Sequence, residues 1–275
     1  MKVLKQLLDF YINSSVHVAL AVYALSWVTL KKFDINYDSS VLWFNFYATI
    51  TGYNFVKYFG IAKWHHRSLA SWLRVTQVFS LGCFILMCYY ALQLAEESLV
   101  LIAIFGGVTF LYAIPFLPKK WYLDAQQNLR DISGLKVYII ALVWSGVTVI
   151  LPLVNNEVGF SEDVIVSVLQ VFIFVIALML PFEIIDLRYD SLKLATIPQK
   201  IGVKRTKLLG LVLLLIFYLS EFFKDTIQTD YLIKQLIVCL VLGIFILFAN
   251  QNRTKYYTSF WLEALPVFWL VLMLI

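Results

Sequence analysis

Charged residues are scarce in this chain of 275 residues, where Asp, Glu, Lys and Arg together make up 14%. Soluble domains usually have about a quarter of their residues charged and about half apolar. Here 61% of the residues are hydrophobic and the mean hydropathy is +0.82. This balance excludes an ordinary water-soluble domain and indicates a polytopic membrane protein.

Cysteine is scarce as well, and its placement excludes two kinds of site. Cys83, Cys88 and Cys239 all lie inside apolar runs, so they predict neither a disulfide framework nor a Cys–His metal centre. A basic domain is also lacking despite the net charge of +5, so nucleic acid is not an expected partner. No stretch between the apolar runs is long enough for a soluble domain, and residues 1–275 are expected to form one transmembrane domain.

What the chain does have is a series of apolar runs, each long enough to cross a membrane as a helix. We predict an all-α fold with nine transmembrane helices. Lys2 and Lys5 precede an apolar stripe, which predicts a short interfacial helix before the first span rather than a cleaved signal peptide. The nine predicted spans are residues 14–30, 41–59, 72–94, 99–116, 137–154, 164–182, 208–223, 231–249 and 260–275.

A cluster of acids ends the sixth predicted span. Glu183, Asp186 and Asp190 have the spacing i, i+3, i+7, which places them on one stripe of a helix. Carboxylates stacked in this way repel one another unless a cation lies among them. Mg²⁺ suits the position because it binds oxygen ligands, often one or two carboxylates together with substrate phosphates. The alternative is a solvated helix end with no ligand.

This stretch resembles the second aspartate motif of the UbiA-type intramembrane prenyltransferases, D-x-x-D-x-x-x-D followed by a basic loop and T-[LI]-P-x-x-[LI]-G. The three acids match, with Glu183 for the first Asp, and residues 196–202 match the tail. The intervening loop is about one residue shorter, and Ala195 replaces a basic residue. The resemblance implies nine helices around a central cavity, with Glu183, Asp186 and Asp190 holding Mg²⁺ on the diphosphate of a polyprenyl substrate.

Basic residues supply candidate phosphate ligands. Residues 111–120 resemble the family's Y-S-x-P-P-x-R-x-K segment and end in Lys119 and Lys120, although a positive anchor for the fourth span explains these two lysines equally well. Arg188 and Lys193 lie within the acidic motif itself. We predict that these four residues, together with Lys57, bind the diphosphate.

The first aspartate motif of the family is missing. It belongs at the end of the second span, yet no Asp or Glu occurs between Asp38 and Glu96. Matching Asn54 to the motif's Asn puts Lys57 in the stretch where acids are expected. Lys57 can bind a phosphate directly, or it can simply extend its ammonium group toward the membrane surface. The resemblance implies that Asn54 and Lys57 face Asp186 and Asp190 across one cavity. Glu221 and Glu263, the other acids in apolar runs, receive no role.

Two function classes follow. The first is a UbiA-like enzyme that transfers a prenyl group from a polyprenyl diphosphate to an acceptor that no residue specifies. The second is a non-catalytic relative that binds an isoprenoid or anionic lipid, or that acts as a membrane scaffold; the missing acids favour it. A transporter is a weaker alternative, because no internal repeat is evident. In each class the chain resides among lipids in the cell (inner) membrane, and the sequence fixes no oligomeric state.

The charge distribution predicts the orientation. With a cytoplasmic N-terminus, 18 of the 22 Lys and Arg residues fall on the cytoplasmic side, as the positive-inside rule requires. Reporter fusions should therefore place the loop containing Lys200 in the cytoplasm and Ile275 outside. A fusion that places the Lys200 loop outside would contradict both the orientation and the resemblance.

Overall fold

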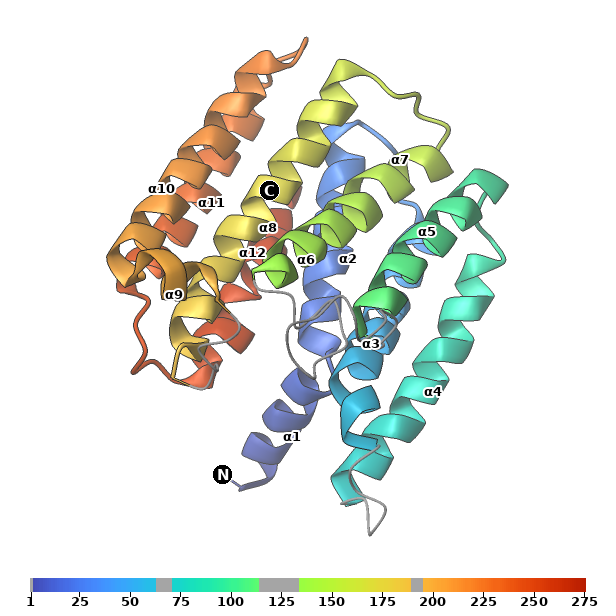
Figure 1. Ribbon diagram of the computed structural model, residues 1–275. Coiled ribbons are helices and arrows are strands. Elements are labelled where there is room, and N and C mark those ends of the chain that lie inside the picture. Colours follow the sequence, from blue (N-terminus) through green and yellow to red (C-terminus); the bar gives the residue numbers. More distant parts are fainter. Residues whose placement is uncertain (1, 63–70, 114–133, 189–194) are drawn as a thin grey trace, which may run out of the picture.

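The computed structural model describes residues 2–62, 71–113, 134–188 and 195–275 (Figure 1). Within these ranges all regular structure is helical, which confirms the predicted all-α class. The helices are α1 (Lys2–Asn13), α2 (Val16–Lys32), α3 (Ser39–Ala62), α4 (Ser71–Ala91), α5 (Glu96–Ala113), α6 (Leu135–Ser145), α7 (Leu151–Asn155), α8 (Glu162–Asp186), α9 (Ile197–Ile201), α10 (Val203–Leu219), α11 (Thr229–Phe248) and α12 (Leu265–Leu274). Two π-helical segments, η3 (Gly146–Ile150) and η6 (Tyr257–Leu262), and a 3₁₀ turn, η5 (Ser220–Phe223), adjoin them.

Each predicted span coincides with a helix or a run of adjoining helices. In the described part of the chain, seven helices are long and apolar enough to cross a membrane, and the bent pair α1–α2 makes an eighth. The predicted span that remains is the second, residues 41–59, which lies in α3; this helix has 24 residues but includes Asn45, Asn54 and Lys57. These polar residues lower its hydropathy, so the count of nine stays a prediction while the multi-pass character is clear.

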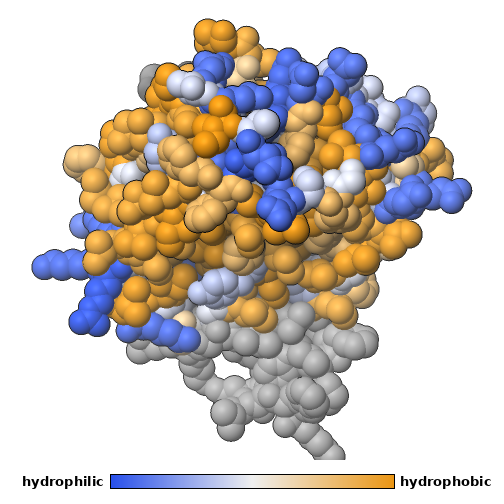
Figure 2. All heavy atoms as spheres, turned by 90° about the horizontal axis from the view of Figure 1, so that it is seen from above, coloured by the Kyte–Doolittle hydropathy of each residue, from blue (hydrophilic) through white to orange (hydrophobic). Residues whose placement is uncertain are grey.

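The helix α2 occupies the middle of the bundle and contacts α3 on one side and α12 on another (Figure 1). From α12 the packing continues through α11 and α10 to α8 and then to α6. The helices α4 and α5 lie at the outside, and their outward residues include Val78, which is 67% exposed, and Val100, which is 61% exposed. Figure 2 looks down on the bundle from the upper end of Figure 1, and on this face hydrophilic residues gather in patches among hydrophobic ones.

Three interruptions of the helical backbone lie inside this bundle, and a buried side chain from another helix binds each one. At the 55° bend between α1 and α2, the Asn54 amide donates to Ser14 O over 3.0 Å. In η3, the Asn45 amide donates to Val147 O over 2.7 Å. In η6, His17 Nε2 donates to Phe260 O over 2.7 Å. Because lipid offers no hydrogen bonds to backbone groups, these contacts allow irregular backbone at membrane depth.

Close packing fixes the position of α5 against η3. A Cβ atom added to Gly146 would lie 2.0 Å from Cζ of Phe105, well inside van der Waals contact. Gly106, the next residue along α5, has open space around its Cα. A side chain at position 146 would therefore have to displace the Phe105 ring, whereas position 106 accepts a side chain.

We predict that Gly146→Ala destabilises the protein by about 1–3 kcal/mol, the usual cost of overpacking. The measurement is thermal unfolding of the purified protein in detergent. Gly106→Ala is the control and should leave the midpoint unchanged or raised, because Ala favours helix over Gly. Adding Phe105→Ala to Gly146→Ala should restore part of the loss; a Gly146→Ala protein as stable as the parent would refute the predicted clash.

Candidate functional site

The acids of the predicted motif and its Thr-Ile-Pro tail contact each other in the structure. Glu183 lies in the last turn of α8 and is only 2% exposed. Its Oε2 accepts a hydrogen bond from the backbone N–H of Ile197 over 3.1 Å, at the start of α9. Thr196, just before α9, donates its backbone N–H to the Gln199 side chain over 3.0 Å. The carboxylate thus binds the first turn of the Thr-Ile-Pro segment, 14 residues further along the chain.

Asp186 is the last residue of α8 and is partly buried. Asp190 and Lys193 lie outside the described residues, as do Lys119 and Lys120, so the three-carboxylate metal site stays a prediction. Within the described ranges no group of three or more His, Cys, Asp or Glu side chains is placed to hold a metal. Glu183 and Asp186 nevertheless fit Mg²⁺ chemically, because that ion commonly uses one or two carboxylates and takes its other ligands from phosphate and water.

Arg188 extends from the same end of α8 to another segment of the chain. One guanidinium nitrogen donates to Arg253 O over 2.9 Å, between α11 and η6. Arg188 is exposed, so a guanidinium remains at the surface near the acidic motif. Its role as a phosphate ligand stays a prediction, and its bond to Arg253 gives it a structural role as well.

Lys57 and Asn54 project from α3 toward the bend between α1 and α2. Lys57 Nζ donates to Ser15 Oγ over 2.8 Å and more weakly to Asn13 O over 3.4 Å. The Asn54 side chain accepts from Ser15 Oγ and donates to Ser14 O and Ser80 Oγ. Asn54 is therefore engaged in helix packing, whereas Lys57 retains an exposed surface. Whether the two face Asp186 and Asp190 across one cavity stays a prediction.

Glu263 is the residue in this region to which sequence reasoning assigned no role. It directly follows η6, inside the apolar stretch 257–274, and is partly buried. It lies within electrostatic range of Lys57 of α3, of Tyr53 of the same helix and of Tyr11 of α1. An acid within a membrane span is a sign of function by itself, because it is costly there without a partner. The sequence shows that Glu263 lies in an apolar run, but it does not show which residues of α3 lie near it.

Hydrogen bonds hold the backbone around Glu263 in place. His17 Nε2 donates to Phe260 O, so the other ring nitrogen, Nδ1, is left to accept from the Tyr11 hydroxyl over 2.8 Å. The His17 and Phe260 rings also stack, with centroids 5.1 Å apart. Nearby, Trp144 Nε1 donates to the Tyr53 hydroxyl over 3.0 Å. The α3 side of the region therefore offers a cation, Lys57, close to a carboxylate contributed by the last span.

Comparison with known proteins supports the fold. The structure is similar over 99% of this chain to a solved structure of a digeranylgeranylglyceryl phosphate synthase in membranes, with a TM-score of 0.58, 16% sequence identity and 98% coverage of that chain. No protein-family model and no curated protein sequence matches this sequence. At this identity the likeness shows the fold alone, a helical membrane bundle of the kind seen in that synthase.

Proposed function

We propose that this protein is a UbiA-like prenyltransferase homologue that binds a polyprenyl diphosphate and transfers its prenyl group to an acceptor. The observation that carries the proposal is the bond from Ile197 N–H to Glu183, which joins the acids to the Thr-Ile-Pro tail. The alternative, a solvated helix end with no ligand, does not explain why Glu183 is only 2% exposed and bound to that tail. The fold similarity over nearly the whole chain provides independent support.

Residues of this chain have distinct roles in the proposed site. Asp186 and Asp190, with Glu183, hold Mg²⁺, which offsets the negative charge of the diphosphate when bound. Glu183 also positions α9 through Ile197. Lys57, Lys119, Lys120, Arg188 and Lys193 bind phosphate oxygens. Charge-assisted hydrogen bonds of this kind are about twice as strong as neutral ones.

Glu263 and Lys57 form the second side of the proposed site. Relatives of UbiA type carry an acidic motif at the end of the second span, and this chain has none between Asp38 and Glu96. Glu263 brings one carboxylate to the neighbourhood of Lys57 from the last span instead. A carboxylate beside an ammonium has almost no net charge as a pair. This side of the site therefore binds phosphate and metal less selectively than two acids that hold Mg²⁺ would.

The same feature favours the alternative function, a non-catalytic relative that binds an isoprenoid or anionic lipid. Departure of a diphosphate requires strong stabilisation of the developing charge. With Lys57 where acids that hold a second Mg²⁺ are expected, the site stabilises a departing diphosphate less well, which favours binding without transfer. In either case we propose a multi-pass protein of the cell membrane with its N-terminus in the cytoplasm.

The test is thermal unfolding of the purified protein with geranylgeranyl diphosphate, with and without Mg²⁺. At about 100-fold excess over Kd, a ligand that binds only the folded state should stabilise it by roughly 2.7 kcal/mol. Geranylgeraniol, which has the same tail without phosphate, is the ligand control. Asp186→Asn should remove the Mg²⁺-dependent part of the shift, and Lys57→Met should reduce the part that persists in chelator.

Glu162→Gln, at the opposite end of α8, is the matched variant and should behave like the parent protein. No shift with the diphosphate under any condition would overturn the ligand proposal. A shift that Asp186→Asn leaves intact would overturn the role of the acids. Native mass spectrometry of the lipid bound after incubation with the prenyl diphosphate then separates the two functions: a lipid with the mass of the prenyl chain joined to an acceptor, with the diphosphate lost, identifies a transferase, and an unaltered anionic lipid identifies a binder.

A further inference from the structure

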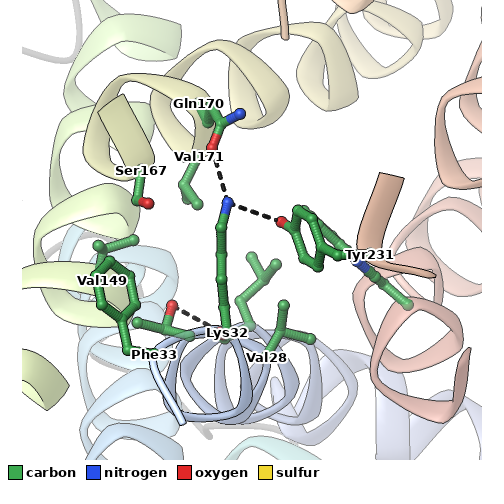
Figure 3. A pocket seen from close by; sticks show the side chains of 11 residues that line it. Val28, Lys32, Phe33, Val149, Ser167, Gln170, Val171 and Tyr231 are labelled. Carbon is green, nitrogen blue, oxygen red and sulfur yellow. Dashed lines mark hydrogen bonds between the residues drawn. The ribbon is translucent and has the colours of Figure 1, made fainter. Parts of the chain in front are cut away.

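A second buried polar cluster lies at the other end of α8, where α2 ends and α11 begins. Lys32 Nζ donates to Gln170 Oε1 over 3.0 Å, to Glu221 Oε2 over 2.9 Å and to the Tyr231 hydroxyl over 3.0 Å. Lys224 Nζ donates to the same Gln170 and Glu221 oxygens over 2.8 and 2.9 Å. Figure 3 shows Lys32 extending between Gln170 and Tyr231.

With both lysines protonated, the charges in this cluster do not balance. Two lysines share one carboxylate, and the side chains of Lys224 and Glu221 are each only 3% exposed, with Lys32 at 13%. The neighbouring acids Asp225 and Asp230 do not balance the second lysine. Asp225 is exposed, and Asp230 forms an ion pair with Lys234 over 2.7 Å. An excess positive charge in a poorly solvated site is costly unless an anion accompanies it or a proton leaves.

A cavity of about 20 Å³ adjoins the cluster, with Lys32, Gln170, Ser167, Tyr231 and Trp269 in its lining (Figure 3). Its polar groups are largely hydrogen-bond donors. Ser167 Oγ and Trp269 Nε1 are buried and have no hydrogen-bond partner among the described residues. The Tyr231 oxygen accepts from Lys32, which leaves the phenolic hydrogen to be donated elsewhere.

We propose that this cavity binds one small monovalent anion of the size of chloride. The excess charge of Lys32 and Lys224 over Glu221 favours an anion, and the hydroxyls of Ser167 and Tyr231 supply donors in the lining of the cavity. A buried water needs at least about 10–15 Å³, so the cavity has room for a single water-sized or halide-sized occupant. A phosphate or a lipid headgroup does not fit.

The proposed anion would join five helical segments, because the residues that line the cavity come from α2, η3, α8, α11 and α12. It would lie at the opposite end of α8 from Glu183 and Asp186, so the proposal is independent of the prenyl diphosphate site. The alternative is that one of the lysines is neutral, in which case the cluster is already balanced and the cavity holds a water.

The test is thermal unfolding at constant ionic strength while chloride replaces gluconate in the buffer. We expect the midpoint to rise with chloride and to saturate. Lys224→Met makes the cluster neutral and should abolish the saturable rise. Glu221→Gln adds a second excess charge and should lower the half-saturating chloride concentration by about tenfold or more. Ser167→Ala removes one donor with little change in shape and should weaken the effect if Lys224→Met does not fold.

Lys234→Met, which removes a lysine from the exposed Asp230 pair, is the matched control and should keep the full chloride response. Bromide soaked into crystals of the protein should give an anomalous peak between Lys32 and Ser167. The proposal is overturned if chloride and gluconate give equal midpoints in the parent protein. It is also overturned if Lys224→Met and Ser167→Ala both retain the parent response.

Discussion

The structure depends on satisfying backbone groups wherever a helix is interrupted within the membrane. An unbonded carbonyl or N–H costs several kcal/mol in hydrocarbon, and this bundle has a bend and two π-helical segments. Asn54, Asn45 and His17 each donate to a carbonyl at one of these places. Burial of apolar surface cannot provide such specificity, because lipid is as apolar as the side chains it replaces. These three polar contacts therefore select which helices are neighbours.

The interruptions also determine where the candidate site lies. The bend between α1 and α2 provides the Ser15 hydroxyl that binds Lys57. The segment η6, held by His17, is followed at once by Glu263. At the end of α8, the Glu183 carboxylate accepts a hydrogen bond from the N–H of Ile197. This N–H belongs to the first turn of α9 and has no partner within its own helix. Polar chemistry in this membrane protein is thus concentrated where the backbone is irregular, which is where a charged headgroup finds donors.

Hydropathy in the sequence predicted most of the described helices, because most spans are contiguous apolar runs. The acidic motif, with its three acids on one stripe, assumed a helix that continues to Asp190, whereas α8 ends at Asp186 and Asp190 lies outside the described residues. The contact between Glu183 and Ile197 follows from that motif only when the fold is known. Other features escaped prediction because they join distant residues: His17 and Phe260 are 243 positions apart, and Lys32 and Glu221 are 189 apart. Glu263 and Glu221 were visible as acids in apolar runs, but their partners were not. The π-helical segments have no simple sequence signature, and the close approach of Phe105 to Gly146 in η3 joins residues of different helices.

The central claim is that one diphosphate site lies between the acidic end of α8 and the Lys57–Glu263 side. The most direct measurement is an experimental structure of the protein with Mg²⁺ and a prenyl thiolodiphosphate, an analogue whose diphosphate leaves slowly. We expect density for the diphosphate in contact with Asp186 and within reach of the Lys57 ammonium, with the prenyl tail among the apolar spans. Density for the diphosphate away from both residues, or only on the surface of the protein, would contradict this account.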